Sequence, residues 1–262
     1  MNRRWIAFTL LSTLLHASTV AQAPPDTSQI AILLHHGDTL TEQFDNQGAL
    51  AKYRGAFALD TTRCETLWRI SRAYIDIGEH LPVATREEQD EQLQTYEMAL
   101  DFAERAVDAD RGNSMAWTRR SIAKGRIALF KGIWESVSLV KQTKADIDTA
   151  LAIDSTNDVA NYILARIHAK VTEKPGILRW PLGLGWADID DAIKYYEKAI
   201  ALKPDFIMYR LDAARAYVET DQYDLARKHL SAIDTISNQD EDDGRYRKEA
   251  ADLLKEITEE EQ

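Results

Sequence analysis

Apolar residues recur at helical spacing along almost the whole chain after Ala23. Three of the resulting stripes are formed by Ile30, Leu33 and Leu34; by Leu67, Ile70, Tyr74 and Ile77; and by Ile193, Tyr196, Ala199 and Ile200. Pro204 follows the third stripe, where a proline is expected just beyond a helix end. No stretch alternates with a period of two for long, as a half-buried strand would. The pattern therefore predicts an all-α protein.

One helical pattern recurs along the chain in degenerate form. It consists of a small residue, an apolar residue four positions later, and a second small residue three positions after that. Its five copies are Ala49/Tyr53/Ala56, Ala99/Ala103/Ala106, Thr143/Ile147/Ala150, Ala192/Tyr196/Ala199 and Ala226/Leu230/Ile233. This resembles the second helix of a tetratricopeptide repeat, a helix-turn-helix unit of about 34 residues. A candidate first helix precedes each copy, and its small residue at the close-packing position lets the paired helices approach.

The spacing of the copies predicts an irregular array. Extra residues fall between the two helices of pairs two, three and four, at about 80–95, 128–140 and 172–187. A last, polar helix over Gly244 to Glu260 has the character of the terminal cap that a repeat array requires. We therefore expect a tetratricopeptide-like, right-handed α-α superhelix of about five helix pairs, with long insertions within the pairs and a C-terminal capping helix.

Several segments together carry a family resemblance over residues 45–257. They are residues 67–73 (LWRISRA), 103–106 (AERA) with Asn113 and Trp117, 150–154 (ALAID), Trp180 with Pro181, 195–199 (YYEKA) and 204–206 (PDF). In their order and spacing they resemble the regulator of microtubule dynamics family, whose members carry a divergent tetratricopeptide-like domain. The resemblance implies that fold. The microtubule role in the family's name is not carried over, because the chain begins like an exported protein.

The N-terminus has the pattern of an export signal. Arg3 and Arg4 precede an apolar run from Trp5 to Leu15, and Ala21-Gln22-Ala23 supplies a small-x-small cleavage site. We expect a signal peptide over residues 1–23, a single helical domain over 24–262, and an exported, periplasmic or secreted location. A mitochondrial presequence is the alternative. No later stretch approaches the roughly 20 apolar residues of a membrane span, so no stable membrane insertion is expected after cleavage.

Composition narrows the function further. The formal charge is −11, from 43 acidic and 32 basic residues, which disfavours nucleic acid as a partner. Cys64 is the one cysteine, so an internal disulfide and a Cys-rich metal site are excluded, and we expect a buried apolar role for it. The G-x-S-x-G, H-E-x-x-H and P-loop motifs do not occur in the sequence. We predict a non-catalytic protein without cofactor or metal.

A few polar positions invite a functional interpretation but favour a structural one. Gly183 and Gly185 form half a nucleotide fingerprint without a preceding strand, so a turn is expected. His168 and His229 stand alone in helical stretches, where locally hydrogen-bonded histidines are expected. The acidic residues within 188–191 and 238–244 lack a calcium-loop frame and favour solvated turns and helix N-termini.

The concave face carries the functional prediction. In the resembling repeats, set positions of each first helix face the inner groove, and transferring them gives Trp68, Arg72, Met115, Thr118, Ile122, Arg126, Val159, Tyr162, Arg166, Lys170, Met208, Leu211, Arg215 and Val218. The same position is arginine in three units, at Arg72, Arg166 and Arg215. A basic, partly apolar groove suits a ligand with an anionic group and an apolar body. Alternatively, these arginines pair with neighbouring carboxylates.

The insertion within the fourth helix pair is unusually apolar. Residues 175–186 hold two tryptophans, Trp180 and Trp186, and only one charged residue, Arg179. We expect the segment to fold back over the helices or to act as a lid on the groove, with both tryptophans as lid candidates and Trp134 as a contact. If exposed, it would form a patch for a protein partner or a membrane surface.

Two functions follow from the predicted groove. The first is a scaffold that binds a protein partner through the groove of the array. The alternative is a lipid-binding or phospholipid-transfer domain, in which the apolar insertion at 172–187 closes the groove over a phospholipid. One member of the resembling family is associated with phospholipid binding in this domain.

Overall fold

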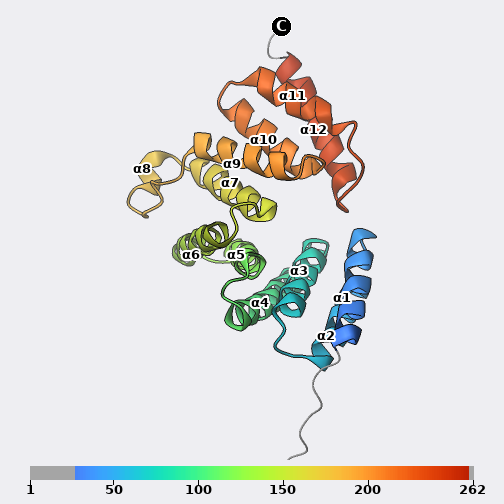
Figure 1. Cartoon of the computed structure of the whole chain (residues 1–262). Coiled ribbons are helices and arrows are strands. Elements are labelled where there is room, and N and C mark those ends of the chain that lie inside the picture. The colour runs from blue at the N-terminus through green and yellow to red at the C-terminus, as the bar shows by residue number, and fades with distance from the viewer. Residues whose placement is uncertain (1–26, 260–262) are drawn as a thin grey trace, which may run out of the picture.

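In the computed structural model, which describes residues 27–259, every regular element of that part of the chain is a helix (Figure 1). The pairs are α1 (Thr27–Glu42) with α2 (Asn46–Leu59), α3 (Cys64–Glu79) with α4 (Arg86–Ala109), α5 (Ser114–Ala128) with α6 (Ile133–Ile153), α7 (Asp158–Thr172) with α9 (Ile189–Leu202), and α10 (Ile207–Glu219) with α11 (Tyr223–Ile233). The short α8 (Gly176–Arg179) lies inside the fourth pair, and α12 (Asp243–Glu259) follows the fifth. The predicted all-α array of five helix pairs with a terminal helix is confirmed. The signal-peptide prediction lies outside the described residues.

Similar short turns connect the first three pairs to the pairs that follow them. Asp60, Asp110 and Asp154 each end a second helix, and each carboxylate accepts a hydrogen bond from the backbone N–H two residues later, at 2.8 to 2.9 Å. Asn113 and Asn157 then cap α5 and α7 by accepting from the N–H groups three residues on. Because such side chains satisfy free backbone groups at helix ends, these turns set where each new pair starts.

Glycine permits close packing inside the first two pairs. A Cβ atom on Gly37 would lie 2.3 Å from Cε1 of Tyr53, and one on Gly78 would lie 2.6 Å from Cε1 of Tyr96. In both cases the glycine is on the first helix and the tyrosine on the second, with both tyrosines buried. Gly37 is the small residue predicted at the close-packing position of the first pair, whereas Gly78 is not at the position that the repeat frame predicts for the second pair.

The extra residues within pairs two to four lie where the spacing predicted, but two of the three stretches lengthen a helix. α4 begins at Arg86, because Thr85 and Glu88 form a reciprocal capping box. α6 begins at Ile133, shortly after α5 ends at Ala128. Only the third stretch, around α8, is largely non-helical. The long second helices extend the walls of the array beyond the length of an ordinary repeat.

The C-terminal segment returns to the beginning of the array. The loop between α11 and α12 contacts both α2 and the end of α3, through Asn46 and His80, which both face Glu241. Figure 1 shows the start of α12 descending toward α1 and α3. The helices thus curve far enough for the last element to meet the first two pairs. Within residues 27–259, no helix has both the length and the apolar content needed to cross a membrane.

Candidate functional site

A cavity of about 1310 Å³ lies on the inner side of the array. The first helices of pairs two to five, α3, α5, α7 and α10, contact one another in succession and supply its main wall. The first turns of α4 form one rim, and the α11–α12 loop with the start of α12 forms another. We call this space the inner cavity.

Five of the seven predicted groove residues line the inner cavity: Arg72, Arg126, Tyr162, Arg166 and Arg215. Trp68 and Lys170 do not. Trp68 packs in the cluster beside Leu67, with the Arg69 guanidinium 4.2 Å from its ring. Lys170 is exposed and pairs with Glu173 at 2.6 Å. Of the other transferred positions, Ile122, Val159 and Met208 also line the cavity, whereas Met115, Thr118, Leu211 and Val218 do not.

The predicted arginines are paired with carboxylates. Arg72 Nε lies 3.3 Å from Asp76 Oδ2, and Arg126 pairs with Glu79. Asp212 is shared, because Arg166 Nε lies 3.7 Å and Arg215 Nη1 2.8 Å from its two oxygens. The cavity lining holds eight basic and seven acidic side chains, so it is nearly balanced in charge rather than basic as predicted. The sequence pattern located the arginines but not the carboxylates that neutralise them.

Asp212 organises the deepest part of this network. Besides the two arginines, it accepts a hydrogen bond from the Tyr162 hydroxyl at 2.7 Å. Burial and the neighbouring Asp212 raise the pKa of Tyr162 well above its ordinary value, so the hydroxyl stays protonated as a donor. Arg215 continues the network to Glu249 of α12 at 2.5 Å. Pair five and the terminal helix are therefore joined to α7 by charge across the cavity.

Arg119 on α5 lines the same cavity and was missed by the sequence analysis. Its side chain is 9% exposed, and its Nε has no hydrogen-bond partner. Within the described part of the chain, no carboxylate forms an ion pair with it. The Trp68 ring lies behind it, 6.0 Å from the guanidinium carbon. Arg119 lies three residues before Ile122, which occupies the groove position of this repeat, so the transfer of repeat positions did not select it. The sequence signal that could have indicated it is the adjacent pair of arginines, Arg119 and Arg120.

The electrostatic surroundings of Arg119 are mixed. Burial, and then the nearby Arg72, lower the pKa of its guanidinium to about 10, so it remains a cation at neutral pH. Asp76 and Asp158 act in the opposite direction without bonding to it. Each is engaged elsewhere, Asp76 with Arg72 at 3.3 Å and Asp158 as acceptor from the Tyr209 hydroxyl at 2.9 Å. Arg119 is thus a buried cation whose nearby carboxylates already have partners.

The lid candidates lie away from the inner cavity. Residues 182–187 fold back against α6 and α7, where Leu184 and Trp186 pack with Val137 and Val140. Trp186 meets His168 edge-on at 5.2 Å, and Trp180 is 77% exposed. Neither tryptophan lines the cavity, so in this structure the segment folds back over the helices, the other arrangement that we expected for it. The physical reason is that α6, lengthened at its start, offers the nearest apolar surface.

The remaining polar candidates have structural partners. His168 Nδ1 accepts from the Asp188 N–H at 3.2 Å, and burial lowers its pKa; His229 Nε2 lies 2.8 Å from Glu197. Asp188 caps α9, and Gly183 has a positive φ of 67° in a turn. Asp243 is buried and accepts from two backbone N–H groups. Among the described residues, no group of three His, Cys, Asp or Glu is arranged to hold a metal ion. Cys64 is a free, buried thiol.

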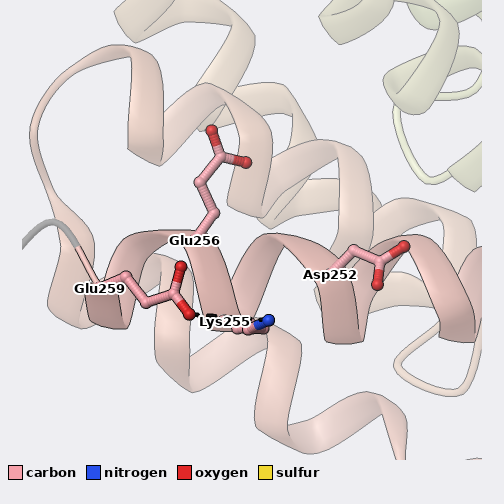
Figure 2. A pocket seen from close by; sticks show the side chains of 4 residues that line it. All are labelled: Asp252, Lys255, Glu256 and Glu259. Atoms are coloured by element: carbon pink, nitrogen blue, oxygen red, sulfur yellow. Dashed lines mark ion pairs between the residues drawn. The ribbon is translucent and has the colours of Figure 1, made fainter.

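A second, shallow hollow lies along α12. Figure 2 shows its four lining residues, Asp252, Lys255, Glu256 and Glu259, all on that helix. Lys255 and Glu259 form an exposed ion pair at 3.6 Å. The hollow is therefore a solvated helix face with no converging groups.

A family relationship extends over most of the chain. The model of the family described as "Regulator of microtubule dynamics protein 1-3" matches residues 33–258. The chain belongs to this family. The resemblance inferred from its scattered segments is thereby confirmed.

Two animal members illustrate how distant the similarity is. Regulator of microtubule dynamics protein 3 of Bos taurus is 24% identical over 249 residues, covering 89% of this chain and 50% of that protein. Its counterpart from Rattus norvegicus is 24% identical over 236 residues, covering 86% and 48%. The chain spans about half the length of these curated relatives.

A solved structure supports the fold. TTC0263, a thermophilic tetratricopeptide-repeat protein of Thermus thermophilus, superposes with a TM-score of 0.64, covering 86% of this chain and 98% of its own. Sequence identity is 16%, so the likeness concerns architecture alone. It establishes the predicted tetratricopeptide-like array for this family member.

Proposed function

We propose that this protein is a non-catalytic scaffold whose inner cavity receives an acidic, partly apolar segment of a protein partner. The observation that carries the proposal is Arg119, a cation that lines the cavity, is only 9% exposed, and has no ion-pair partner among the described residues. A buried charge without a partner is costly, and an incoming carboxylate removes that cost.

The chemistry around Arg119 favours a carboxylate as the first contact. Guanidinium groups bind carboxylates through two parallel hydrogen bonds, which a point charge cannot do. Arg72 lies near enough to affect Arg119 electrostatically and is itself held by one carboxylate at 3.3 Å. Ile122, Val159 and Met208 line the same cavity and are half-buried, which supplies apolar contact for the rest of a bound segment.

The charge balance of the cavity favours a peptide over a lipid. Fifteen charged side chains line it, and an acyl chain placed against them would displace their water without offering hydrogen bonds in exchange. A peptide backbone brings donors and acceptors that can satisfy these groups. Phospholipid binding, the alternative from the sequence, is therefore kept as an outcome of the experiment. An exported location, proposed from the pattern of residues 1–23, would place the partner outside the cytosol.

The test uses peptides selected on the wild-type protein from a random displayed library, then synthesised and measured by calorimetry. We expect selected sequences enriched in Asp or Glu next to apolar residues. Arg119→Gln should weaken their binding by at least about tenfold, the loss of one charged hydrogen-bonded contact. Arg119→Lys should give an intermediate loss, because it keeps the charge without the fork. Arg111→Gln, which removes an exposed arginine in the α4–α5 turn, should change nothing.

Three results would overturn the proposal. Equal affinity of Arg119→Gln, shown to be folded by circular dichroism, would remove Arg119 from the site. Failure to select any peptide would contradict a peptide-binding cavity. Stoichiometric phospholipid released by organic solvent from the purified protein would establish the lipid alternative instead.

A further inference from the structure

The most exposed large apolar side chains of the described residues are concentrated in two segments. Six of them, between 57% and 82% exposed, are Leu129, Ile133, Trp134, Ile177, Leu178 and Trp180, and Ile32 at 55% comes next. The first three belong to the α5–α6 turn and the start of α6, and the others to α8 and the residue after it. We call these six residues the apolar edge. Its two tryptophans are the most exposed of the described tryptophans.

Residues that follow each of the two segments in the chain are in contact. Val137 and Val140 of α6 pack with Leu184 behind α8, and Lys144 Nζ lies 5.2 Å from the Trp186 ring. A Cβ atom on Gly183 would lie 2.9 Å from Lys141 Nζ. α6 and α8 accordingly occupy the same margin of the molecule (Figure 1). The apolar edge is therefore formed by two insertions whose adjoining residues pack together.

Hydrogen bonds hold both segments in ordered turns. Ser136 Oγ donates to the carbonyl of Ala128 at 2.8 Å, which ties the start of α6 to the end of α5. Arg179 Nη1 donates to the carbonyl of Ala187 at 2.7 Å, and the Trp180 N–H donates to Gly176 at 3.0 Å. The exposed side chains are thus presented by fixed backbone. Large apolar groups held in water on one surface mark an interaction site.

The charge of this surface is opposite to that of the whole chain. Residues 129–144 and 170–186 contain six basic and two acidic residues, and Lys144 pairs with Asp148 just beyond the first stretch, which leaves a net charge of +3, while the whole chain carries −11. Lys141 and Lys174 are exposed and have no carboxylate partner in the part of the chain that the structure describes. A basic surface with exposed tryptophans is complementary to an anionic bilayer, where indole rings settle at headgroup level and lysines contact anionic lipids.

We propose that the apolar edge docks the protein, peripherally and reversibly, on the surface of an anionic lipid membrane. Leu129 is the one residue of the apolar edge that also lines the inner cavity. The proposal can still be tested separately from the function of that cavity, because neither tryptophan nor either free lysine lines it. A second copy of the chain fits the edge poorly, since two copies would bring equal positive charges together. An acidic protein partner is the remaining occupant, and the experiment distinguishes it.

The test is cosedimentation of the full chain with vesicles of phosphatidylcholine alone and of phosphatidylcholine with phosphatidylglycerol. We expect binding to the anionic vesicles that weakens as salt is raised. The double variant Trp134→Ser/Trp180→Ser should have a partition coefficient onto anionic vesicles at least about tenfold lower than that of the wild type, because two large apolar groups are removed. The partition coefficient of Lys141→Glu/Lys174→Glu should be at least about twentyfold lower, which corresponds to about fivefold for each lysine removed.

Matched controls separate the edge from general effects. Lys52→Glu/Lys228→Glu makes the same change in net charge on α2 and α11, and Ile32→Ser removes the next most exposed apolar residue. Both should bind vesicles like the wild type. Because the tryptophans are mostly exposed, the tryptophan variant should unfold within about 2 °C of the wild type.

The outcomes are decisive in either direction. Absence of binding to anionic vesicles at low salt would overturn the proposal, as would binding that the tryptophan variant retains. A dimer in sedimentation equilibrium that Trp134→Ser dissociates would show that another copy covers the edge. None of these results bears on peptide binding at Arg119, so failure here leaves the proposed function standing.

Discussion

Asn46 Nδ2 donates a hydrogen bond to Glu241 Oε2 at 3.2 Å, although 195 residues separate them in the chain. The contact joins α2 to the loop before α12, and Glu241 also lies 3.5 Å from His80 Nδ1 at the end of α3. The next residue, Asp242, pairs with Arg245, which pairs with Glu249, and Glu249 in turn pairs with Arg215 on α10. The array is thus closed by polar contacts that bound the inner cavity on one side.

The closing contacts should depend on pH through His80. Partial burial opposes its protonation, but the hydrogen bond with the Asp76 carbonyl and the nearby Glu241, Asp242 and Glu79 outweigh it and raise its pKa. A raised folded-state pKa means that the stabilisation is complete below the unfolded value of about 6.5 and is lost as pH rises through the folded value. The difference in unfolding free energy between wild type and His80→Gln should therefore be larger near pH 6 than near pH 8.5.

Urea unfolding of both proteins at each pH measures that difference. The raised pKa of Asp240 and that of Glu79 also make stability pH-dependent, but both groups are present in wild type and variant, so their effects largely cancel. A difference that stays constant or grows above pH 7 would show that protonated His80 does not hold the loop.

Gly37 should be intolerant of a methyl group. The Tyr53 ring that faces it is 1% exposed and is held by hydrogen bonds to Thr41 and Asp38, so it cannot move aside. Gly37→Ala should destabilise the protein by about 2 kcal/mol through overpacking. Gly125→Ala is the matched control, because its Cβ would meet only Thr143 Cγ2 at 4.0 Å, and it should stabilise by about 0.5–1 kcal/mol. Thermal unfolding that shifted both variants in the same direction would refute the close-packing argument.

What the sequence could predict was local. The small residues around Tyr53 and Tyr196 and the Asp- and Asn-bearing turns identified the repeat, because they act within one or two helices. The early start of α4 could also have been predicted, because Thr85 and Glu88 have the spacing of a capping box. The spacing of the repeats alone predicted only an insertion there. The pairing of Arg166 with Asp212, and the contact of Asn46 with Glu241, depend on how the whole array curves. The hydrophobic and repeat patterns therefore could not predict which carboxylates line the cavity or where the apolar edge lies.

A buried charge cluster should be essential to the third helix pair. Asp146 of α6 is 5% exposed and accepts hydrogen bonds from Arg120 at 2.6 and 3.0 Å and from Lys124 at 2.9 Å. Asp146→Ala leaves the two cations without their shared carboxylate in a largely buried place, and it should lower the free energy of unfolding by about 3–5 kcal/mol. Asp148→Ala, two residues along the same helix, removes an exposed pair with Lys144 and should cost less than about 0.5 kcal/mol. Chemical denaturation of the two variants measures both, and comparable losses would contradict the distinction.

The thiol of Cys64 should be inert in the folded protein. The residue is 6% exposed at the start of α3, packed beside Leu67 and Val107, and burial, with smaller effects of Glu65 and Asp110, raises its pKa to about 12. Because the thiolate is the reactive form, both the pKa and the burial oppose reaction with a disulfide reagent. Labelling with dithionitrobenzoate at neutral pH should be at least about a hundredfold slower than in guanidinium, where the thiol regains an ordinary pKa near 8.5. Rapid labelling of the native protein would mean that α3 opens locally, and that the wall it gives the inner cavity is not rigid.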